Sequence, residues 1–157
     1  MAHEHGGDTA HGHGNLLIVW NESYDTGLKI IDEQHRGIVS IINSLHHALF
    51  VRDDESLLRP VAEMIMGYTK IHFTTEVEML SASSYPRLPE HLARHDHLIA
   101  EADRIFLKCL KDGGEATPFL NFLKEWWVVH ITREDMGYRE HLTAYLHSPR
   151  PVIIKRS

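Results

Sequence analysis

Four long segments of the chain carry apolar residues at intervals of three and four, and in each segment histidine takes one of the apolar positions. Such intervals place side chains on one face of an α-helix, the face that packs into a protein core. The segments span about residues 27–51, 54–83, 89–112 and 117–147. A fold for this chain must therefore bury several imidazoles within its apolar stripes.

Short helix-breaking connections separate the four segments. The stretch 83–89 contains two prolines, Gly113 and Gly114 follow the third segment, and Thr117 with Pro118 suits the first turn of the fourth. We see no β-rich region in the sequence. We therefore predict an all-α fold, an antiparallel up-down four-helix bundle with helices about 36–46 Å long.

The bundle is predicted to have a tail at each end. Residues 1–14 hold four of the fourteen histidines together with four glycines, which predicts a disordered His/Gly-rich tail. Residues 15–148 would form the bundle, beginning with an N-terminal arm at 15–26 that packs its apolar cluster around Trp20 onto the body. Residues 149–157 would form an extended C-terminal tail.

Composition excludes several classes of protein. A net charge of -6 argues against non-specific binding to nucleic acid, and a single cysteine, Cys109, excludes both an intrachain disulfide and a thiolate metal cluster. No apolar run reaches the ~18 residues of a membrane-spanning helix. The first residues lack the basic and apolar regions of a secretory signal, so we expect a cytoplasmic protein.

Five histidines and one glutamate occupy stripe positions, and together they indicate a metal site. One histidine on an apolar face is usually a core residue with a hydrogen-bond partner. Burying five imidazoles and a carboxylate without a metal would leave many polar groups unsatisfied. In an up-down bundle all six fall at a similar level, towards the end where the first and third helices begin. They are His35, His72, Glu76, His91, His95 and His130.

These donors suit iron, zinc, copper or manganese. Five histidines are too many for one four-coordinate zinc ion, whereas two metals that share carboxylates use them naturally. A second carboxylate should come from the fourth helix, with Glu134 and Asp135 as candidates. In an α-helix Glu134 returns to the face of His130, whereas Asp135 is rotated about 140° away. Geometry alone favours Glu134 and leaves the choice open.

Short motifs along the chain carry a family resemblance. They are Trp20 with Tyr24-Asp25-Thr26-Gly27 leading to Ile31-Asp32-Glu33-Gln34-His35, then His72-Phe73-Thr74-Thr75-Glu76, then Tyr85-Pro86 before His91-Leu92-Ala93-Arg94-His95, and finally Trp126, His130-Ile131 and Asp135. Each motif alone is weak, but in this order they span about residues 20–138 and are highly specific. The chain resembles the hemerythrins, and the bacterial ones in particular.

The resemblance implies a four-helix bundle around a non-haem di-iron centre that binds O2 reversibly. One iron would have three histidine ligands and the other two, with two carboxylates and an oxo or hydroxo group as bridges. The first iron would be held by His91, His95 and His130, the second by His35 and His72, and the bridging carboxylates would be Glu76 and Asp135. The resemblance thus selects Asp135 over Glu134.

The same resemblance implies an O2 pocket beside the two-histidine iron, with Phe73, Trp127 and Ile131 as apolar neighbours. It implies O2 carriage, storage or delivery without an enzymatic role, with azide or nitric oxide as other small ligands. A protein that receives the O2 is not identified by the sequence. The alternatives are a di-iron redox enzyme (a peroxidase, an oxidase or a nitric-oxide-handling protein) and an O2- or iron-sensing interaction module.

Trp127 departs from the family pattern, which has leucine three residues before the histidine of the fourth helix. Trp127 either fills the core as a bulky apolar residue or narrows the O2 pocket. Both interpretations stay open at this point.

Overall fold

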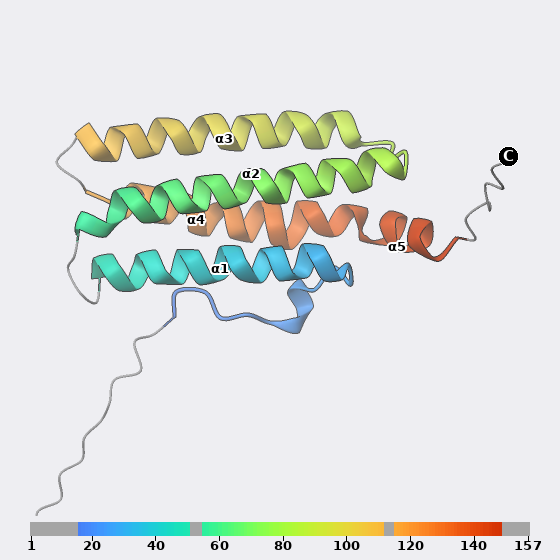
Figure 1. Ribbon diagram of the computed structural model, residues 1–157, viewed down its shortest axis with the longest axis horizontal. Helices are drawn as coiled ribbons and strands as arrows, with labels where there is room; N and C mark the ends of the chain where they lie inside the picture. Colours follow the sequence, from blue (N-terminus) through green and yellow to red (C-terminus); the bar gives the residue numbers. More distant parts are fainter. Residues whose placement is uncertain (1–15, 51–54, 112–114, 149–157) are drawn as a thin grey trace, which may run out of the picture.

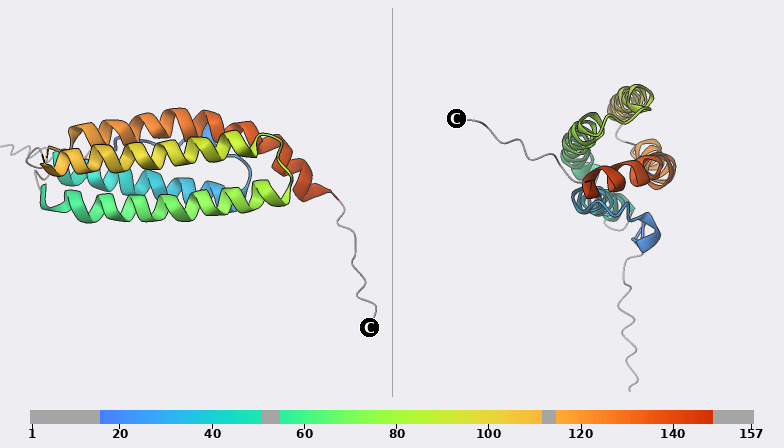
Figure 2. Two further views of the ribbon diagram at one scale, coloured as in Figure 1. Left: turned by 90° about the horizontal axis from the view of Figure 1, so that it is seen from above. Right: turned by 90° about the vertical axis from the view of Figure 1, so that its right-hand side faces the viewer.

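A computed structural model describes residues 16–50, 55–111 and 115–148, which form a bundle of four antiparallel helical rods (Figure 1). The first three rods are α1 (Lys29–Phe50), α2 (Leu58–Ala82) and α3 (Leu88–Lys111), and the fourth begins with α4 (Thr117–Trp126). α1 and α3 each pack against both α2 and α4, and the end-on view in Figure 2 shows the four rods around one axis.

The described residues contain helices and no strands, so the predicted all-α up-down bundle is confirmed. Short 3-10 turns, η1 (Glu22–Tyr24) and η2 (Glu55–Leu57), precede α1 and α2. Among the described helices, none is long and apolar enough to cross a membrane. The predicted tails at 1–14 and 149–157 lie outside the described residues.

A buried carboxylate fixes the start of α1. Thr26 donates both its backbone N–H and its hydroxyl to Asp32 Oδ1 at 2.7 Å, and the Gly27 N–H donates to Asp32 Oδ2 at 3.1 Å. Gly27 has φ +80°, a left-handed conformation that glycine adopts without the steric cost of a Cβ. Asp32 lies one helical turn before His35, so this cap sets the level of His35 in the bundle.

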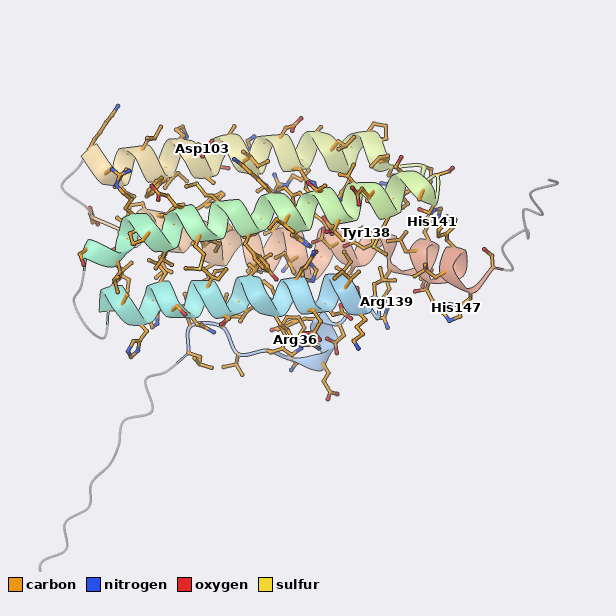
Figure 3. The ribbon with its side chains drawn as sticks, in the orientation of Figure 1. Arg36, Asp103, Tyr138, Arg139, His141 and His147 are labelled. Carbon is orange, nitrogen blue, oxygen red and sulfur yellow. The ribbon has the colours of Figure 1, made fainter. Side chains whose placement is uncertain are left out.

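The N-terminal arm packs along α1 through polar and aromatic contacts. The Ile18 N–H donates to the Asn43 side chain at 2.9 Å, and the Asn43 amide donates back to the Ile18 carbonyl at 2.8 Å. The guanidinium of Arg36 lies 4.6 Å from the centre of the Trp20 ring and pairs with Asp25 at 2.6 Å. Figure 3 shows Arg36 on the side of α1 that faces the arm.

The apolar core is divided into two clusters with a layer of buried polar side chains between them. On α1, His35 separates Ile31, which belongs to the smaller cluster, from Ile38 in the larger one. Each fully buried Leu or Ile contributes about 1.5–3 kcal/mol, which offsets the cost of a polar layer inside the bundle. The smaller cluster consists of Leu28, Ile31, Leu80, Tyr138 and Leu142.

The fourth rod is not the single α-helix that the sequence predicts over 117–147. After α4 it continues as a π-helical segment, η3 (Trp127–Glu134), then as a 3-10 turn, η4 (Asp135–Tyr138), and then as α5 (Arg139–His147). Figure 1 shows α5 extending past the ends of α1 and α2. The Asp135 N–H donates to the His130 carbonyl, five residues back instead of the four of an α-helix. Such π-bulges occur frequently at functional sites.

Candidate metal centre

Seven predicted donors come together inside the bundle. α1 supplies one imidazole, α2 an imidazole and a carboxylate, α3 two imidazoles, and the fourth rod an imidazole and a carboxylate. Five of the seven residues have no exposed surface, and the other two, His95 and His91, are 3% and 9% exposed. The seven are His35, His72, Glu76, His91, His95, His130 and Asp135. Their places in the core-facing stripes account for this burial.

The seven residues form two groups that share both carboxylates. Glu76 and Asp135 join His35 and His72 in one group and the remaining three histidines in the other. Within each group, one donor atom from every residue lies within 4.8 Å of the donor atoms of the others. The structure therefore brings all the predicted donors together, and their binding of iron stays a prediction.

Two pairs of imidazole nitrogens face each other at a spacing that suits a shared metal ion. The Nε2 atoms of His35 and His72 are 3.2 Å apart, and those of His95 and His130 are 3.1 Å apart. Two nitrogens bound to one metal at about 2.1 Å and at right angles lie about 3 Å apart. Each pair therefore fits two neighbouring ligands of one metal ion.

Asp135 faces both groups with different oxygens. Its Oδ2 lies 3.4 Å from His35 Nε2, and its Oδ1 lies 3.4 Å from His130 Nε2. Neither oxygen has a hydrogen-bond partner among the described residues, although the side chain is fully buried. A buried carboxylate without donors is costly, and a cation on each side would compensate it. Asp135 thus fits the position of a bridging ligand.

Glu76 has one oxygen directed to the histidines and the other to a tyrosine. Its Oε2 lies 3.2 Å from His95 Nε2, 3.3 Å from His91 Nε2 and 3.7 Å from His72 Nε2, so it approaches imidazoles of both groups. Its Oε1 accepts a hydrogen bond from the hydroxyl of Tyr138. Figure 3 shows Tyr138 between α2 and the fourth rod. This hydrogen bond fixes the carboxylate plane, so that Oε2 faces the imidazoles.

Burial favours the neutral form of four imidazoles in the cluster. It lowers the pKa of His35 to about 3 and that of His130 to about 4, and neighbouring imidazoles add to the effect. Burial also lowers the pKa of His72 and of His95. Neutral imidazoles present lone pairs to a metal, so at neutral pH these four rings need not release protons before they bind a cation.

The two carboxylates shift in opposite directions. Burial and the negative charge of Glu76 raise the pKa of Asp135 well above its ordinary value. Burial acts to raise the pKa of Glu76 as well, but His72 and the hydrogen bonds from His91 and His95 hold it well below its ordinary value. Two carboxylates this close in a buried site cannot both be charged without a compensating cation. The donor set therefore fits a positively charged metal centre.

The π-helical segment decides which carboxylate of the fourth rod faces inward. Hydrogen bonding over five residues returns Asp135, and not Glu134, to the face of His130. Glu134 is partly exposed, accepts a hydrogen bond from His130 Nδ1 at 2.7 Å, and accepts another from Arg94 Nε at 3.1 Å. The geometric preference for Glu134 assumed an α-helix throughout, and the structure corrects it.

Partners on the outer ring nitrogens orient two of the histidines. Gln34 Oε1 lies 3.2 Å from His72 Nδ1, and the Gln34 amide donates to Thr75 Oγ1 at 2.9 Å. Glu134 has the same role towards His130. An acceptor on Nδ1 fixes the tautomer and directs Nε2 to the metal position, as is common for metal-bound histidines.

Comparison with known proteins decides the family. The family model described as the hemerythrin HHE cation binding domain matches residues 26–142, which is most of the chain and includes all seven donors. The chain belongs to the hemerythrin family. The predicted family resemblance is therefore confirmed.

Relatives in the hemerythrin family cover nearly the same length. A bacteriohemerythrin of Stenotrophomonas maltophilia is 27% identical over 131 residues, covering 83% of this chain and 85% of the relative. A bacteriohemerythrin of Pseudomonas aeruginosa is 28% identical over 142 residues, covering 89% of each chain. Crystal structures of hemerythrin point mutants superpose with a TM-score of 0.73 at 23% identity, covering 82% of this chain and 99% of theirs. This likeness shows that the fold is shared.

In this hemerythrin-family chain the predicted O2-pocket residues are buried beside the imidazoles. The Phe73 ring stacks on His95 with centroids 3.5 Å apart. The Trp127 ring lies 6.2 Å from the ring of His35, and Ile131 has no exposed surface. Phe73 also lies 5.7 Å from the ring of His72, so both aromatic residues contact the two-histidine group, Trp127 through His35 and Phe73 through His72.

Two residues that contact the cluster were not predicted from the sequence. Gln34 directly precedes His35, and its long polar side chain in a core helix is a weak signal. Tyr138 follows Asp135 by three residues, so extending the fourth stripe beyond the carboxylate would have found it. Both residues act on a proposed ligand, Gln34 on His72 and Tyr138 on Glu76.

Proposed function

We propose that this chain binds O2 reversibly at a non-haem di-iron centre, as a carrier, store or delivery protein and not as an enzyme. The irons would be held by His91, His95 and His130 on one side and by His35 and His72 on the other, bridged by Glu76, Asp135 and an oxo or hydroxo group. The observation that carries the proposal is this unequal division around shared carboxylates. The two-histidine group offers one side-chain ligand fewer, which leaves a coordination position for a gas.

Iron in this setting would supply a redox-active cation that exchanges electrons with O2. The protein ligands are five imidazoles and two carboxylates, so they donate less negative charge than a carboxylate-rich di-iron site. The smaller donation favours binding of O2 over cleavage of its O–O bond. Burial, which keeps imidazoles such as His35 and His130 neutral, thus serves the proposed chemistry directly.

Apolar side chains exclude water from the two-histidine group. Trp127 is 2% exposed and lies beside His35, while Ile131, Ile31 and Ile38 have no exposed surface. A site closed to water would limit proton transfer to O2 in the pocket. With protons available, O2 would leave in a reduced form instead of being released unchanged. The apolar wall therefore supports reversible binding.

A redox enzyme on the same centre is the second candidate, and Tyr138 favours it. Its buried hydroxyl donates a hydrogen bond to Glu76. Burial, together with the charges of Asp135 and Glu76, raises the pKa of Tyr138 well above its ordinary value, so the hydroxyl keeps its proton. Reduction of O2 or peroxide also needs protons delivered through positioned groups, and the hydrogen bond between Tyr138 and Glu76 is one such contact beside the centre.

Addition of O2 to the anaerobically reduced, iron-loaded protein separates the two candidates. A carrier develops a visible absorption band that disappears when O2 is removed and returns on the next addition. An enzyme bleaches irreversibly and consumes peroxide over many turnovers. An iron content well below two per chain would refute the di-iron proposal itself.

A matched pair of histidine variants ties the spectrum to the site. His35→Ala removes one of the two imidazoles of the smaller group and should abolish the O2-dependent band. His97→Ala removes an imidazole whose side chain is 62% exposed and faces Glu101, outside the cluster. The His97 variant should keep both irons and the band. Loss of the band in both variants would point to a general loss of folding.

A further inference from the structure

A polar pocket lies between α3 and the fourth rod, directly beside the metal cluster. Its volume is about 480 Å³, and one of its wall residues is His91, the most exposed histidine of the cluster. We propose that this pocket binds a small organic oxyanion, a carboxylate or a phosphate ester, held by Arg87 and Arg133. This site is distinct from the proposed O2 position, which belongs to His35 and His72.

The charges around the pocket leave two guanidinium groups available. Arg94 is already paired with Glu134 at 3.1 Å. Arg87 and Arg133 are both exposed and form no ion pair within the described ranges. Glu90 is the remaining carboxylate of the wall, so free positive charge exceeds free negative charge by one. This excess stands out in a chain whose net charge is -6.

The shape and chemistry of the wall suit an oxyanion. A guanidinium presents a planar fork of donors that matches the two oxygens of a carboxylate or phosphate. Arg87 directly precedes α3, whose N-terminal end favours negative charge. The hydroxyl of Tyr85 is a further donor, since its contact with the Gly137 carbonyl is long at 3.5 Å. A volume of about 480 Å³ is in the range of organic ligands and exceeds what inorganic phosphate fills.

An occupant of this pocket would be connected to the metal cluster on its three-histidine side. His91 forms part of the pocket wall itself. Arg94 also lines the pocket and pairs with Glu134, which in turn accepts a hydrogen bond from His130 Nδ1. An oxyanion that also forms a hydrogen bond with Arg94 competes with Glu134 for this guanidinium. Binding should therefore change the hydrogen bond to His130 and with it the electronic environment of the centre.

Titration calorimetry of the full-length, iron-loaded protein at low salt tests the site, with succinate and glycerol phosphate as probes. We expect saturable one-to-one binding, and the tighter probe identifies the oxyanion class. Replacing both arginines (Arg87→Gln with Arg133→Gln) should weaken binding at least about tenfold. Glu90→Gln should tighten it about threefold. Arg139→Gln, a charge change at an exposed position outside this pocket, is the control and should leave binding unchanged.

Two results would overturn the proposal. One is the absence of saturable binding of either probe to the wild-type protein up to about 10 mM. The other is equal binding to the wild type and to the double arginine variant. The heat of binding does not depend on O2, so a failure here is distinguishable from a failure of the proposed function. For the connection to the centre, saturating oxyanion should shift the visible spectrum, and Glu134→Gln should remove that shift; an unchanged wild-type spectrum would contradict it.

Discussion

The carboxylate of Asp135 lies 3.4 Å from the imidazole of His130, although Asp135 is five residues further along the chain. The π-helical hydrogen bond between the same two residues explains this proximity. An α-helix would direct Glu134 to the core and rotate Asp135 away from it. The irregular segment therefore lets one rod supply an inward carboxylate and also an outer acceptor, Glu134, to the same histidine.

Asp135→Asn and Glu134→Gln should separate these two roles. Asparagine lacks the charge that would compensate two cations, so we expect Asp135→Asn to bind fewer than two irons per chain. Glu134→Gln keeps all seven donors and loses only the charged acceptor on His130. Loss of such a partner typically weakens metal binding about 10–100-fold. Metal analysis after dialysis against graded chelator measures both effects, and an equal loss in the two variants would contradict the assignment.

The bundle and its donors could be predicted from the sequence because both follow from helical spacing. His35, His91 and His95 continue stripes of apolar residues, and any regular helix places them inward. The choice between Glu134 and Asp135 could not be derived in the same way, since it depends on a change of helix type after Trp126. Neighbouring residues in the sequence do not reveal that change. The family resemblance indicated Asp135 without giving the physical reason.

Tyr138→Phe should destabilise the metal-free protein more than the metal-loaded protein. In the metal-free state the hydroxyl supports the buried negative charge of Glu76, and a hydrogen bond to a charged group contributes about 1.5–3 kcal/mol. A bound cation takes over much of this role. Urea denaturation in the two states measures the difference. Tyr85→Phe is the matched control, because its hydroxyl makes one long contact at 3.5 Å, and we expect a change below about 0.5 kcal/mol.

The stability of the metal-free protein should fall as the pH drops below about 6.5. In the unfolded chain histidines gain protons near that pH, whereas the folded state keeps His130 neutral to about pH 4 and His35 neutral to about pH 3. Between these limits the unfolded state binds more protons, so each of these two histidines lowers the free energy of unfolding by up to about 1.4 kcal/mol per pH unit. Asp135 acts in the opposite direction, because its raised pKa lets the folded state hold a proton that the unfolded state releases.

Urea denaturation of chelator-treated protein from about pH 7 to about pH 5 measures this dependence. His35→Leu removes one titrating group and should give a shallower slope than the wild type. A free energy of unfolding that stays constant over this range would contradict the neutral, buried state of the imidazoles. An equally steep slope in the variant would contradict the contribution assigned to His35.

Trp127→Leu, which restores the residue typical of the family, should both destabilise the protein and shorten the life of its O2 complex. Trp127 packs against Trp20 and Tyr24 with ring centroids 5.7 Å away in each case, so the smaller side chain leaves a cavity and loosens the arm. Large-to-small changes of this kind cost about 2–4 kcal/mol.

The space left by Trp127→Leu lies beside His35 and would admit water to the proposed O2 position, which should speed autoxidation. Decay of the O2-dependent absorption measures this rate. Trp126→Leu, a buried tryptophan in ring contact with Phe73 and not with His35, controls for the loss of core volume. Autoxidation at the wild-type rate in Trp127→Leu would show that Trp127 serves only to fill the core.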